Sequence, residues 1–324
     1  MSTSIRIDAY GGPEVMAVVD VDVPAPGPGE ALIKQSACAL NFIDVYMRTG
    51  LYPLPLPTGL GLEAAGTIAA VGADVTDVSV GDRIAYVTQP PGAYASDRIM
   101  PVSRLVKLPE SISERTAAGM MLKGLTAQYL LRRTYRVQAG DTILMHAAAG
   151  GVGLIVCQWA KHLGATVIGT VGSREKAELA KAHGCDHTIL YRDENFKDRV
   201  RELTDGQGVN VVYDSIGKDT FMDSLDCLKP LGTMVTYGNA SGPVEPFSPG
   251  ILAAKGSLYV TRPTLFTHIA ARHDLVEMTD DLFAVVGGGH VKIEINQDYA
   301  LADVAQAHID LEARKTTGST ILIP

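Results

Sequence analysis

Between residues 142 and 238, short apolar runs typical of buried strands alternate with segments whose apolar residues recur at helical spacing. The first run begins at residue 142 and leads through a glycine-rich turn into a helix-like segment that reaches residue 157. Further strands are predicted at 166–171, 187–191, 209–213 and 232–238, with helices at 174–182 and 196–203. This repeated alternation predicts a doubly wound α/β fold with a parallel sheet, which binds ligands at the carboxyl ends of its strands.

The glycine-rich turn after the first strand is the strongest local indication of a ligand. It reads Ala148-Ala-Gly-Gly-Val-Gly153, so two glycines of a G-x-G-x-x-G dinucleotide fingerprint remain while the first is missing. The start of the following helix offers unpaired N–H groups and a positive dipole end to a pyrophosphate. A glycine turn without a ligand is the alternative for so partial a match. A membrane helix is rejected because the stretch contains three glycines and a histidine.

The regions before and after this pattern differ from it in composition. Residues 1–125 contain many glycines and prolines between short apolar runs, which favours a β-rich domain with strands at 31–34, 65–71 and 83–87. Toward the carboxyl terminus, we expect a helix at 271–286 and strands at 291–295 and 319–323 to complete that first domain.

Length and composition agree with a two-domain globular protein. The chain has 324 residues, of which 46% are hydrophobic and 20% are charged, and its formal net charge is −8. This charge and the lack of a basic run argue against nucleic acid as a partner, and the amino terminus has no apolar signal core. The cysteines show no C-x-x-C pairing and are expected to be reduced thiols in a cytoplasmic protein: Cys38, Cys157, Cys185 and Cys227.

The chain resembles the medium-chain dehydrogenase/reductase superfamily, and closely its zinc-free quinone oxidoreductases of the zeta-crystallin type, over essentially its whole length. The resemblance implies a Rossmann NADPH-binding domain at 127–262, inserted into a GroES-like catalytic domain formed by 1–126 and 263–324, and a homodimer. The motifs that carry it, in matching order and spacing, are Asn41-Phe-Ile-Asp-Val-Tyr46, Gly59-Leu-Gly-Leu-Glu-Ala-Ala-Gly66, Val80-Gly-Asp-Arg83, Lys123-Gly-Leu-Thr-Ala127, Ala147 to Gly153, Val212-Tyr-Asp-Ser215, Gly256-Ser-Leu-Tyr-Val-Thr-Arg-Pro263 and Gly318-Ser-Thr-Ile-Leu-Ile-Pro324.

The same comparison argues against a catalytic zinc ion. In the zinc-dependent members, a cysteine stands three residues before the aspartate equivalent to Asp44, and a histidine directly precedes the glutamate equivalent to Glu63. Asn41 and Leu62 occupy those positions here. Leucine cannot bind a metal and an asparagine amide is a poor zinc ligand, while the nearby Cys38 is interpreted as a small buried thiol. No cysteine-rich loop for a structural zinc lies between residues 85 and 97, so we expect chemistry that needs no metal.

Hydride transfer from NADPH to an electron-poor quinone meets that condition, because the cofactor supplies the reactive bond and the protein mainly positions and desolvates. The resemblance implies a cleft between the two domains in which Asn41 and Tyr46 line the nicotinamide end and Tyr52 faces the acceptor. It places Lys123 and Thr126 where the domains meet. Alternatively, Asn41 and Asp44 only cap a helix and the two tyrosines are ordinary half-buried aromatics; Asp44 itself is expected to be structural.

The choice of cofactor depends on the end of the second strand of the parallel sheet, where an acidic residue ordinarily binds the ribose 2′-hydroxyl of NAD. Here the chain reads Val171-Gly-Ser-Arg-Glu-Lys176, with a hydroxyl and two cations instead of a carboxylate at the strand end. This pattern favours the 2′-phosphate of NADPH, with a solvated Lys176 as the alternative. The resemblance implies that Asn41, Tyr46, Lys123 and Thr126 contact the cofactor. The other implied cofactor contacts are Ala149, Gly150, Gly151, Val152, Gly153, Gly172, Ser173, Lys176, Tyr191, Ser215, Tyr237, Gly238, Asn239, Thr261, Arg262 and Arg314.

These observations predict an NADPH-dependent quinone oxidoreductase that acts without metal on a small-molecule quinone. A zinc-free reductase of enones, enals or enoyl thioesters shares the fold and the hydride chemistry and remains an alternative. A non-catalytic protein, such as a lens component or an RNA-binding relative, is a third possibility. The intact cofactor residues and the negative charge argue against it. Neither nucleic acid nor a membrane is an expected partner.

Overall fold

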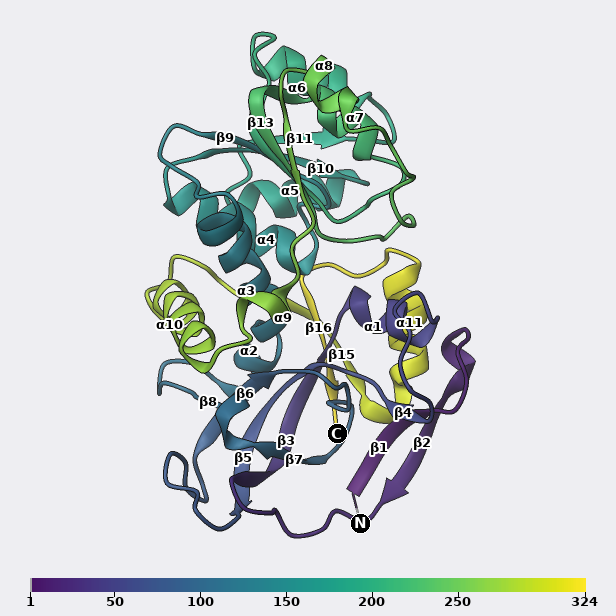
Figure 1. Ribbon diagram of the computed structural model, residues 1–324, viewed down its shortest axis with the longest axis vertical. Coiled ribbons are helices and arrows are strands. Elements are labelled where there is room, and N and C mark those ends of the chain that lie inside the picture. Colours follow the sequence, from purple (N-terminus) through teal and green to yellow (C-terminus); the bar gives the residue numbers. More distant parts are fainter. Residues whose placement is uncertain (1) are drawn as a thin grey trace. The chain divides into compact units, whose positions relative to one another are not determined.

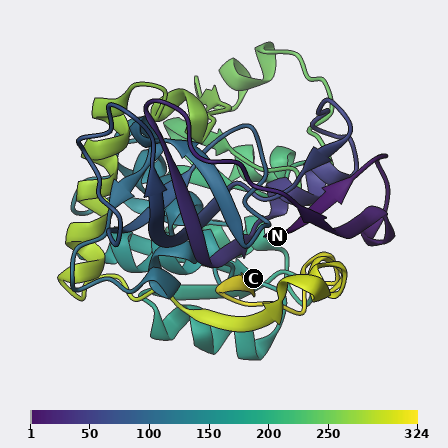
Figure 2. The ribbon, with the colours of Figure 1, turned by 90° about the horizontal axis from the view of Figure 1, so that it is seen from below.

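The computed structural model describes residues 2–324, which form two compact units. The first unit contains the residues up to 125 together with 269–287 and 293–324, so both ends of the chain build it (Figure 2). The second unit contains residues 126–268 and 288–292. No helix of the described chain is long and apolar enough to cross a membrane.

A seven-stranded sheet forms the centre of the first unit, in the order β15-β16-β3-β5-β6-β8, with β7 pairing with β3. Strand β3 explains why the sheet forms: Ala31, Ile33 and Ala37 point into the core while Lys34 and Ser36 are exposed, the two-residue period of a half-buried strand. A second sheet has the order β2-β1-β4. The elements of this unit are β1 Ser2–Ile7, η1 Pro13–Val15, β2 Met16–Val21, β3 Glu30–Leu40, α1 Phe42–Arg48, β4 Thr58–Gly59, β5 Glu63–Val71, β6 Arg83–Val87, β7 Asp97–Pro101, η2 Val102–Arg104, β8 Val106–Lys107, α2 Glu114–Ala118, the first part of α3 Met121–Tyr129, α10 Arg272–Gly287, β15 Ile295–Ala300, η4 Leu301–Asp303, α11 Val304–Glu312 and β16 Ser319–Ile323.

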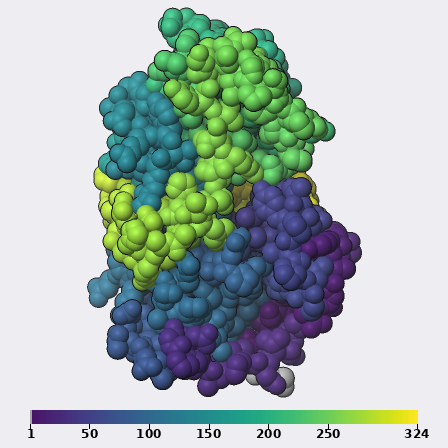
Figure 3. All heavy atoms as spheres, viewed as in Figure 1, coloured from purple at the N-terminus to yellow at the C-terminus, as the bar shows by residue number. Residues whose placement is uncertain are grey.

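Helix α10 packs on the part of the first unit that precedes it by more than a hundred residues. Its yellow-green atoms lie against the blue atoms of the earlier segment in the space-filling view (Figure 3). Two arginines join the segments reciprocally: Arg272 donates to the carbonyl of Leu105 at 2.6 Å, and Arg104 donates to the carbonyl of Ile269 at 3.1 Å. Gly124 allows a close approach as well, because a Cβ there would lie 2.6 Å from the Leu282 side chain.

The second unit is a six-stranded parallel sheet in the order β11-β10-β9-β12-β13-β14, which confirms the predicted doubly wound fold (Figure 1). Successive strands run outward from β9 on one side and from β12 on the other, so the topological switch point lies between these two strands. Its elements are the remainder of α3, the π-helix η3 Leu130–Thr134, β9 Thr142–Met145, α4 Gly151–His162, β10 Thr166–Val171, α5 Arg174–Ala182, β11 His187–Leu190, α6 Phe196–Leu203, β12 Val209–Asp214, α7 Phe221–Asp226, β13 Leu228–Thr236, α8 Gly250–Ala254, β14 Tyr259–Thr261 and α9 Leu265–His268.

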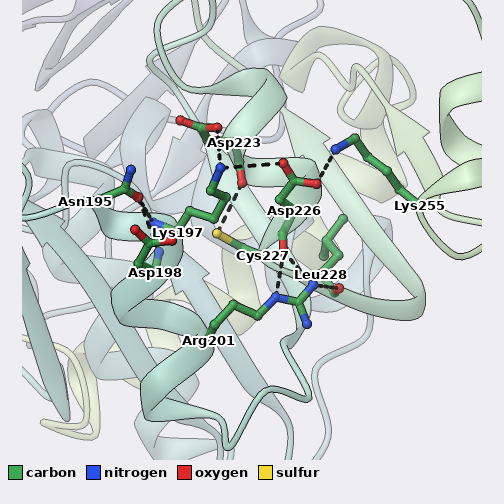
Figure 4. A network of polar contacts seen from close by, with 9 residues as sticks. All are labelled: Asn195, Lys197, Asp198, Arg201, Asp223, Asp226, Cys227, Leu228 and Lys255. Atoms are coloured by element: carbon green, nitrogen blue, oxygen red, sulfur yellow. Dashed lines mark hydrogen bonds and ion pairs between the residues drawn. The ribbon is translucent and has the colours of Figure 1, made fainter.

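The helices on one face of this sheet are joined by polar contacts as well as by the apolar core (Figure 4). Lys197 on α6 pairs with Asp223 on α7 at 3.3 Å, and Asp226 at the end of α7 pairs with Lys255, which follows α8. Arg201 donates to the carbonyls of Asp226 and Leu228, the latter at 3.2 Å. The guanidinium thus satisfies the Asp226 carbonyl, which the end of α7 leaves unpaired, and also binds the first residue of β13.

One predicted strand is wrong. The alternating pattern of residues 291–295 predicts an extended segment, but the strand begins only at Ile295. The Gln158 side chain instead takes up the backbone of Lys292: its oxygen accepts the N–H at 2.8 Å and its nitrogen donates to the carbonyl at 3.0 Å. Residues 288–292 therefore pack with α4 in the second unit, because a side-chain amide takes the place of a neighbouring strand.

Candidate active site

In the first unit, two of the predicted site residues, Asn41 and Lys123, share one buried carboxylate. Asn41, which directly precedes α1, donates through its side-chain nitrogen to Glu63 at 2.7 Å. Lys123 on α3 places its ammonium 3.4 Å from the same carboxylate and 3.2 Å from the carbonyl of Leu40. The N–H of Leu122 donates to the other Glu63 oxygen at 2.6 Å. Glu63 is 0% exposed, and three donors, one of them a cation, compensate the burial of its carboxylate.

Tyr46 lies on α1, the helix that Asn41 precedes, and Tyr52 packs next to it. Their ring centroids are 5.2 Å apart in an edge-on arrangement, and the backbone N–H of Tyr52 donates to the carbonyl of Tyr46 at 3.0 Å. Phe42 packs on Tyr46 with a centroid distance of 5.8 Å. The sequence points to the two tyrosines separately, and the structure brings them into one aromatic cluster on and after α1.

Asp44 belongs to a second buried network that stabilises the start of α1. One carboxylate oxygen accepts the backbone N–H of Asn41 at 2.8 Å and the hydroxyl of Tyr94 at 2.8 Å. The other oxygen has no partner among the described residues. Burial raises the pKa of Asp44 to about 7, and the hydrogen bond from Tyr94 opposes that rise. These contacts give Asp44 a structural role.

The network continues from Tyr94 to His308 and Arg48. The Tyr94 hydroxyl is 3.5 Å from Nε2 of His308, whose Nδ1 accepts a hydrogen bond from Arg48 at 2.9 Å. Arg48 is 1% exposed and pairs with Glu312 at 2.9 Å. Burial and the neighbouring guanidinium lower the pKa of His308 to about 3, so this imidazole is neutral at pH 7. Sequence reasoning missed these residues because nothing in the local pattern marks them as buried.

The donor set at this position does not fit a zinc ion. Leu62 is 0% exposed and has no ligating atom, while the Asn41 amide nitrogen and the Lys123 ammonium already face the Glu63 carboxylate. Burial raises the pKa of Cys38 to about 12, which keeps this neighbouring thiol protonated. Residues 2–324 contain no group of three or more histidine, cysteine, aspartate or glutamate side chains that could hold a metal.

In the second unit, the glycine turn joins β9 to α4 at the switch point of the sheet. Ala147 adopts the left-handed conformation with φ 54°, and the N–H of Ala148 donates to the carbonyl of Thr170 at 3.1 Å, which ties the turn to β10. A Cβ at Gly153 would lie 2.4 Å from the carbonyl oxygen of Ala147, whereas one at Gly150 would lie 3.2 Å from it. Gly153 is therefore required for close packing of α4 on the turn, the role of the last glycine in the fingerprint.

The predicted 2′-phosphate residues meet at the carboxyl ends of β10 and β11. Ser173 precedes α5 and its hydroxyl oxygen accepts the backbone N–H of Lys176 at 3.3 Å, so Lys176 lies in the first turn of that helix. A Cβ at Gly172 would lie 2.9 Å from the hydroxyl of Tyr191, so the glycine allows this tyrosine to cover the strand end. A serine and a lysine at a helix start, beside a tyrosine, can bind a phosphate through hydroxyl, N–H and ammonium groups.

The remaining predicted residues of this unit lie at the carboxyl ends of β12, β13 and β14. Gly238 passes so close to Ser215 that a Cβ would lie 2.4 Å from the serine carbonyl oxygen. The N–H of Tyr237 donates to the carbonyl of Asp214 at 2.8 Å, and Arg262, directly after β14, approaches the carbonyl of Gly238 at 3.5 Å. The carboxyl edge of this sheet thus brings together residues that are more than a hundred positions apart in the sequence.

Two predicted residues lie elsewhere. Thr126 is on α3 and is buried, and it belongs to the second unit while Lys123 belongs to the first. Arg314 follows α11 in the first unit with φ 59°. Glu63 could have been found from its pattern, since a single carboxylate in the apolar run from Gly59 to Gly66 must have buried partners.

Comparisons with known proteins agree with this architecture. The family model described as the alcohol dehydrogenase GroES-like domain matches residues 27–138, and the one described as zinc-binding dehydrogenase matches residues 151–282. A quinone oxidoreductase from Pseudomonas aeruginosa is 55% identical over 100% of both chains. A 2-haloacrylate reductase from a Burkholderia species is 45% identical over 98% of both chains.

Solved structures give the same result. The crystal structure of an Escherichia coli quinone oxidoreductase complexed with NADPH superimposes with a TM-score of 0.97 at 47% identity, covering 99% of this chain and 100% of that chain.

Proposed function

Since the chain belongs to the quinone oxidoreductases of the medium-chain dehydrogenase/reductase superfamily, we propose that it uses NADPH to reduce quinones without a metal ion. The observation that supports NADPH is the set of groups at the end of β10, where Ser173, Lys176 and Tyr191 meet and no carboxylate stands in the position that binds the 2′-hydroxyl of NAD. The NADPH complex of the Escherichia coli relative supports the same cofactor.

When bound, NADPH supplies the hydride, so the residues of this chain are left to bind, orient and exclude water. The turn between β9 and α4 offers backbone N–H groups to the pyrophosphate, with Gly153 allowing the close packing. Asn41 and Lys123 present an amide and a cation held by Glu63, and Tyr46 and Tyr52 supply an apolar surface with hydroxyl groups. We propose as contacts of NADPH Asn41, Tyr46, Lys123, Thr126, Ala149, Gly150, Gly151, Val152, Gly153, Gly172, Ser173, Lys176, Tyr191, Ser215, Tyr237, Gly238, Asn239, Thr261, Arg262 and Arg314, with Tyr52 facing the quinone.

The preference for NADPH can be tested by Lys176→Ala. A charge-assisted hydrogen bond to the 2′-phosphate contributes about 1.5–3 kcal/mol, so its loss should weaken NADPH roughly ten- to a hundredfold. NADH lacks this phosphate and should barely respond. The measurement is the ratio of kcat/KM for the two cofactors with one quinone at fixed ionic strength. Equal losses for both cofactors, or a wild-type preference for NADH, would contradict the assignment.

A reductase of activated alkenes is a second candidate, and the 45% identity to a 2-haloacrylate reductase favours it. In both reactions an electron-poor substrate accepts a hydride from NADPH. The fold and the cofactor site therefore do not distinguish a quinone reductase from an alkene reductase. NADPH oxidation should be followed with a set of benzoquinones and naphthoquinones and, in parallel, with enones and 2-haloacrylates. A higher kcat/KM for the alkenes would replace the quinone assignment.

Assembly and location are further parts of the proposal. We propose a homodimer from the family resemblance, which light scattering after gel filtration would test. All four cysteines are unpaired and buried, which supports a reducing, cytoplasmic compartment.

A further inference from the structure

Glu63 is the common partner of Asn41, which is expected at the nicotinamide end, and of Lys123, which is expected where the two domains meet. It is 0% exposed, at the first position of β5, and it accepts from Asn41, Leu122 and Lys123, three residues on two other segments. A buried carboxylate can only accept hydrogen bonds, so it dictates which atom of each neighbour faces it.

The first consequence concerns the orientation of the Asn41 side chain. Its nitrogen donates to Glu63 at 2.7 Å and lies 3.4 Å from the carbonyl of Ala39. A flipped amide would place its oxygen against the carboxylate, two acceptors with no proton between them. Glu63 therefore keeps the amide nitrogen turned toward itself and directs the amide oxygen away.

The second consequence concerns Lys123. The ammonium has two oxygen neighbours, the Leu40 carbonyl at 3.2 Å and the Glu63 carboxylate at 3.4 Å, and its side chain is 8% exposed. A buried ammonium without a counter-charge would be strongly disfavoured. Glu63 thus fixes the position of a cation beside the Asn41 amide.

We propose that Glu63 is a positioning residue, which orients the Asn41 amide and holds the Lys123 ammonium so that an acceptor oxygen and a positive charge face the nicotinamide end of NADPH. The proposal rests on the proposed function. It predicts that Glu63 matters for the reaction itself and not only for folding, because Asn41 and Lys123 act through the geometry that Glu63 imposes.

The first test uses Glu63→Gln, which keeps the shape but replaces one accepting oxygen with a donor. The matched control is Glu114→Gln, since Glu114 also accepts side-chain hydrogen bonds within this unit, from Thr67 at 2.8 Å and from Ser36. Loss of one hydrogen bond to a charged group should lower kcat about tenfold or more in Glu63→Gln. Binding of 2′,5′-ADP, which carries only the adenosine end of the cofactor, should not change in either variant.

A readout without cofactor comes from nuclear magnetic resonance of the side-chain amide of Asn41, assigned by its loss in Asn41→Asp. The carboxylate should shift one amide proton downfield in the wild type, and Glu63→Gln should remove that shift. An unchanged Asn41 amide signal in a folded Glu63→Gln protein would overturn the proposal.

The second test exchanges donor and acceptor. Asn41→Asp together with Glu63→Gln keeps the net charge and restores a hydrogen bond between the two positions in the opposite direction. The loss of kcat in the double variant should then be smaller than the product of the two single losses, and its thermal stability should recover. Independent losses would show that the two residues do not act together and would overturn the proposal. If the wild type neither binds 2′,5′-ADP nor oxidises NADPH, the proposed function fails instead, a result separate from the behaviour of the Asn41 amide.

Discussion

Gly153 should be intolerant of even one methyl group, whereas Gly150, three residues earlier in the same turn, should accept it. A Cβ at Gly153 would lie 2.4 Å and 2.6 Å from the carbonyl oxygens of Ala147 and Ala148, while ordinary contact begins at 3.4 Å. The α4 helix must therefore move by 3.4 − 2.4 = 1.0 Å relative to the turn, because backbone atoms cannot rotate out of the way. At Gly150 the nearest atom is 3.2 Å away.

Such overpacking typically costs about 1–3 kcal/mol, and contacts with rigid backbone belong at the upper end of that range. The higher helix propensity of alanine offsets about 1 kcal/mol of this loss. We therefore expect Gly153→Ala to lower the free energy of unfolding by about 2 kcal/mol. Gly150→Ala should lower it by only about 0.5 kcal/mol, because alanine is a less favourable N-cap residue than glycine. Urea unfolding measures both, and NADPH titration should show a large loss of affinity for Gly153→Ala alone. Equal stability and equal affinity of the two variants would refute the packing argument.

Two further predictions concern metal and pH. Because Asn41 and Leu62 replace two zinc ligands, metal analysis should find no stoichiometric zinc and EDTA should leave the activity intact; one tightly held zinc per chain would contradict this. Burial raises the pKa of Asp44 from 3.8 to about 7, so its contribution to stability is present below pH 3.8 and is lost as the pH rises through 7. Asp44→Asn removes this titration. The unfolding free energy of the variant minus that of the wild type, measured by urea unfolding, should therefore be larger at pH 8 than at pH 5. A constant difference between the two pH values would show that Asp44 is already ionised.

The sequence was most informative where local patterns decide the structure. The helices at 174–182 and 196–203 begin and end as predicted, because Ser173 and Asn195 cap them and their apolar faces meet the sheet. The parallel sheet followed from its strand–helix alternation. Strand β3 was predicted only over residues 31–34, although it continues to Leu40. Its carboxyl end, from Ala37 to Leu40, is buried on both faces and therefore lacks the alternating pattern.

The sequence identified candidate site residues but not the contacts that their side chains make. The resemblance named Asn41 and Lys123, but not the shared carboxylate that joins them. The network of Tyr94, His308 and Arg48 depends on a helix that lies more than two hundred residues from α1 in the sequence. Hydrophobic periodicity carries no information on such pairings, because only the tertiary fold brings these side chains together.

The placement of residues 288–292 has a consequence for any attempt to isolate the nucleotide-binding half. The chain crosses between the two units four times, after residues 125, 268, 287 and 292. A fragment cut at 126–268 would lack Val291, which is 1% exposed, and the Lys292 backbone that occupies the Gln158 side chain. In the excised piece the Gln158 side-chain nitrogen would keep the Leu154 carbonyl at 2.9 Å, but its oxygen would lose the Lys292 N–H. A minimal fragment of this half therefore requires the later five-residue segment to be grafted back, for example through a linker after residue 268.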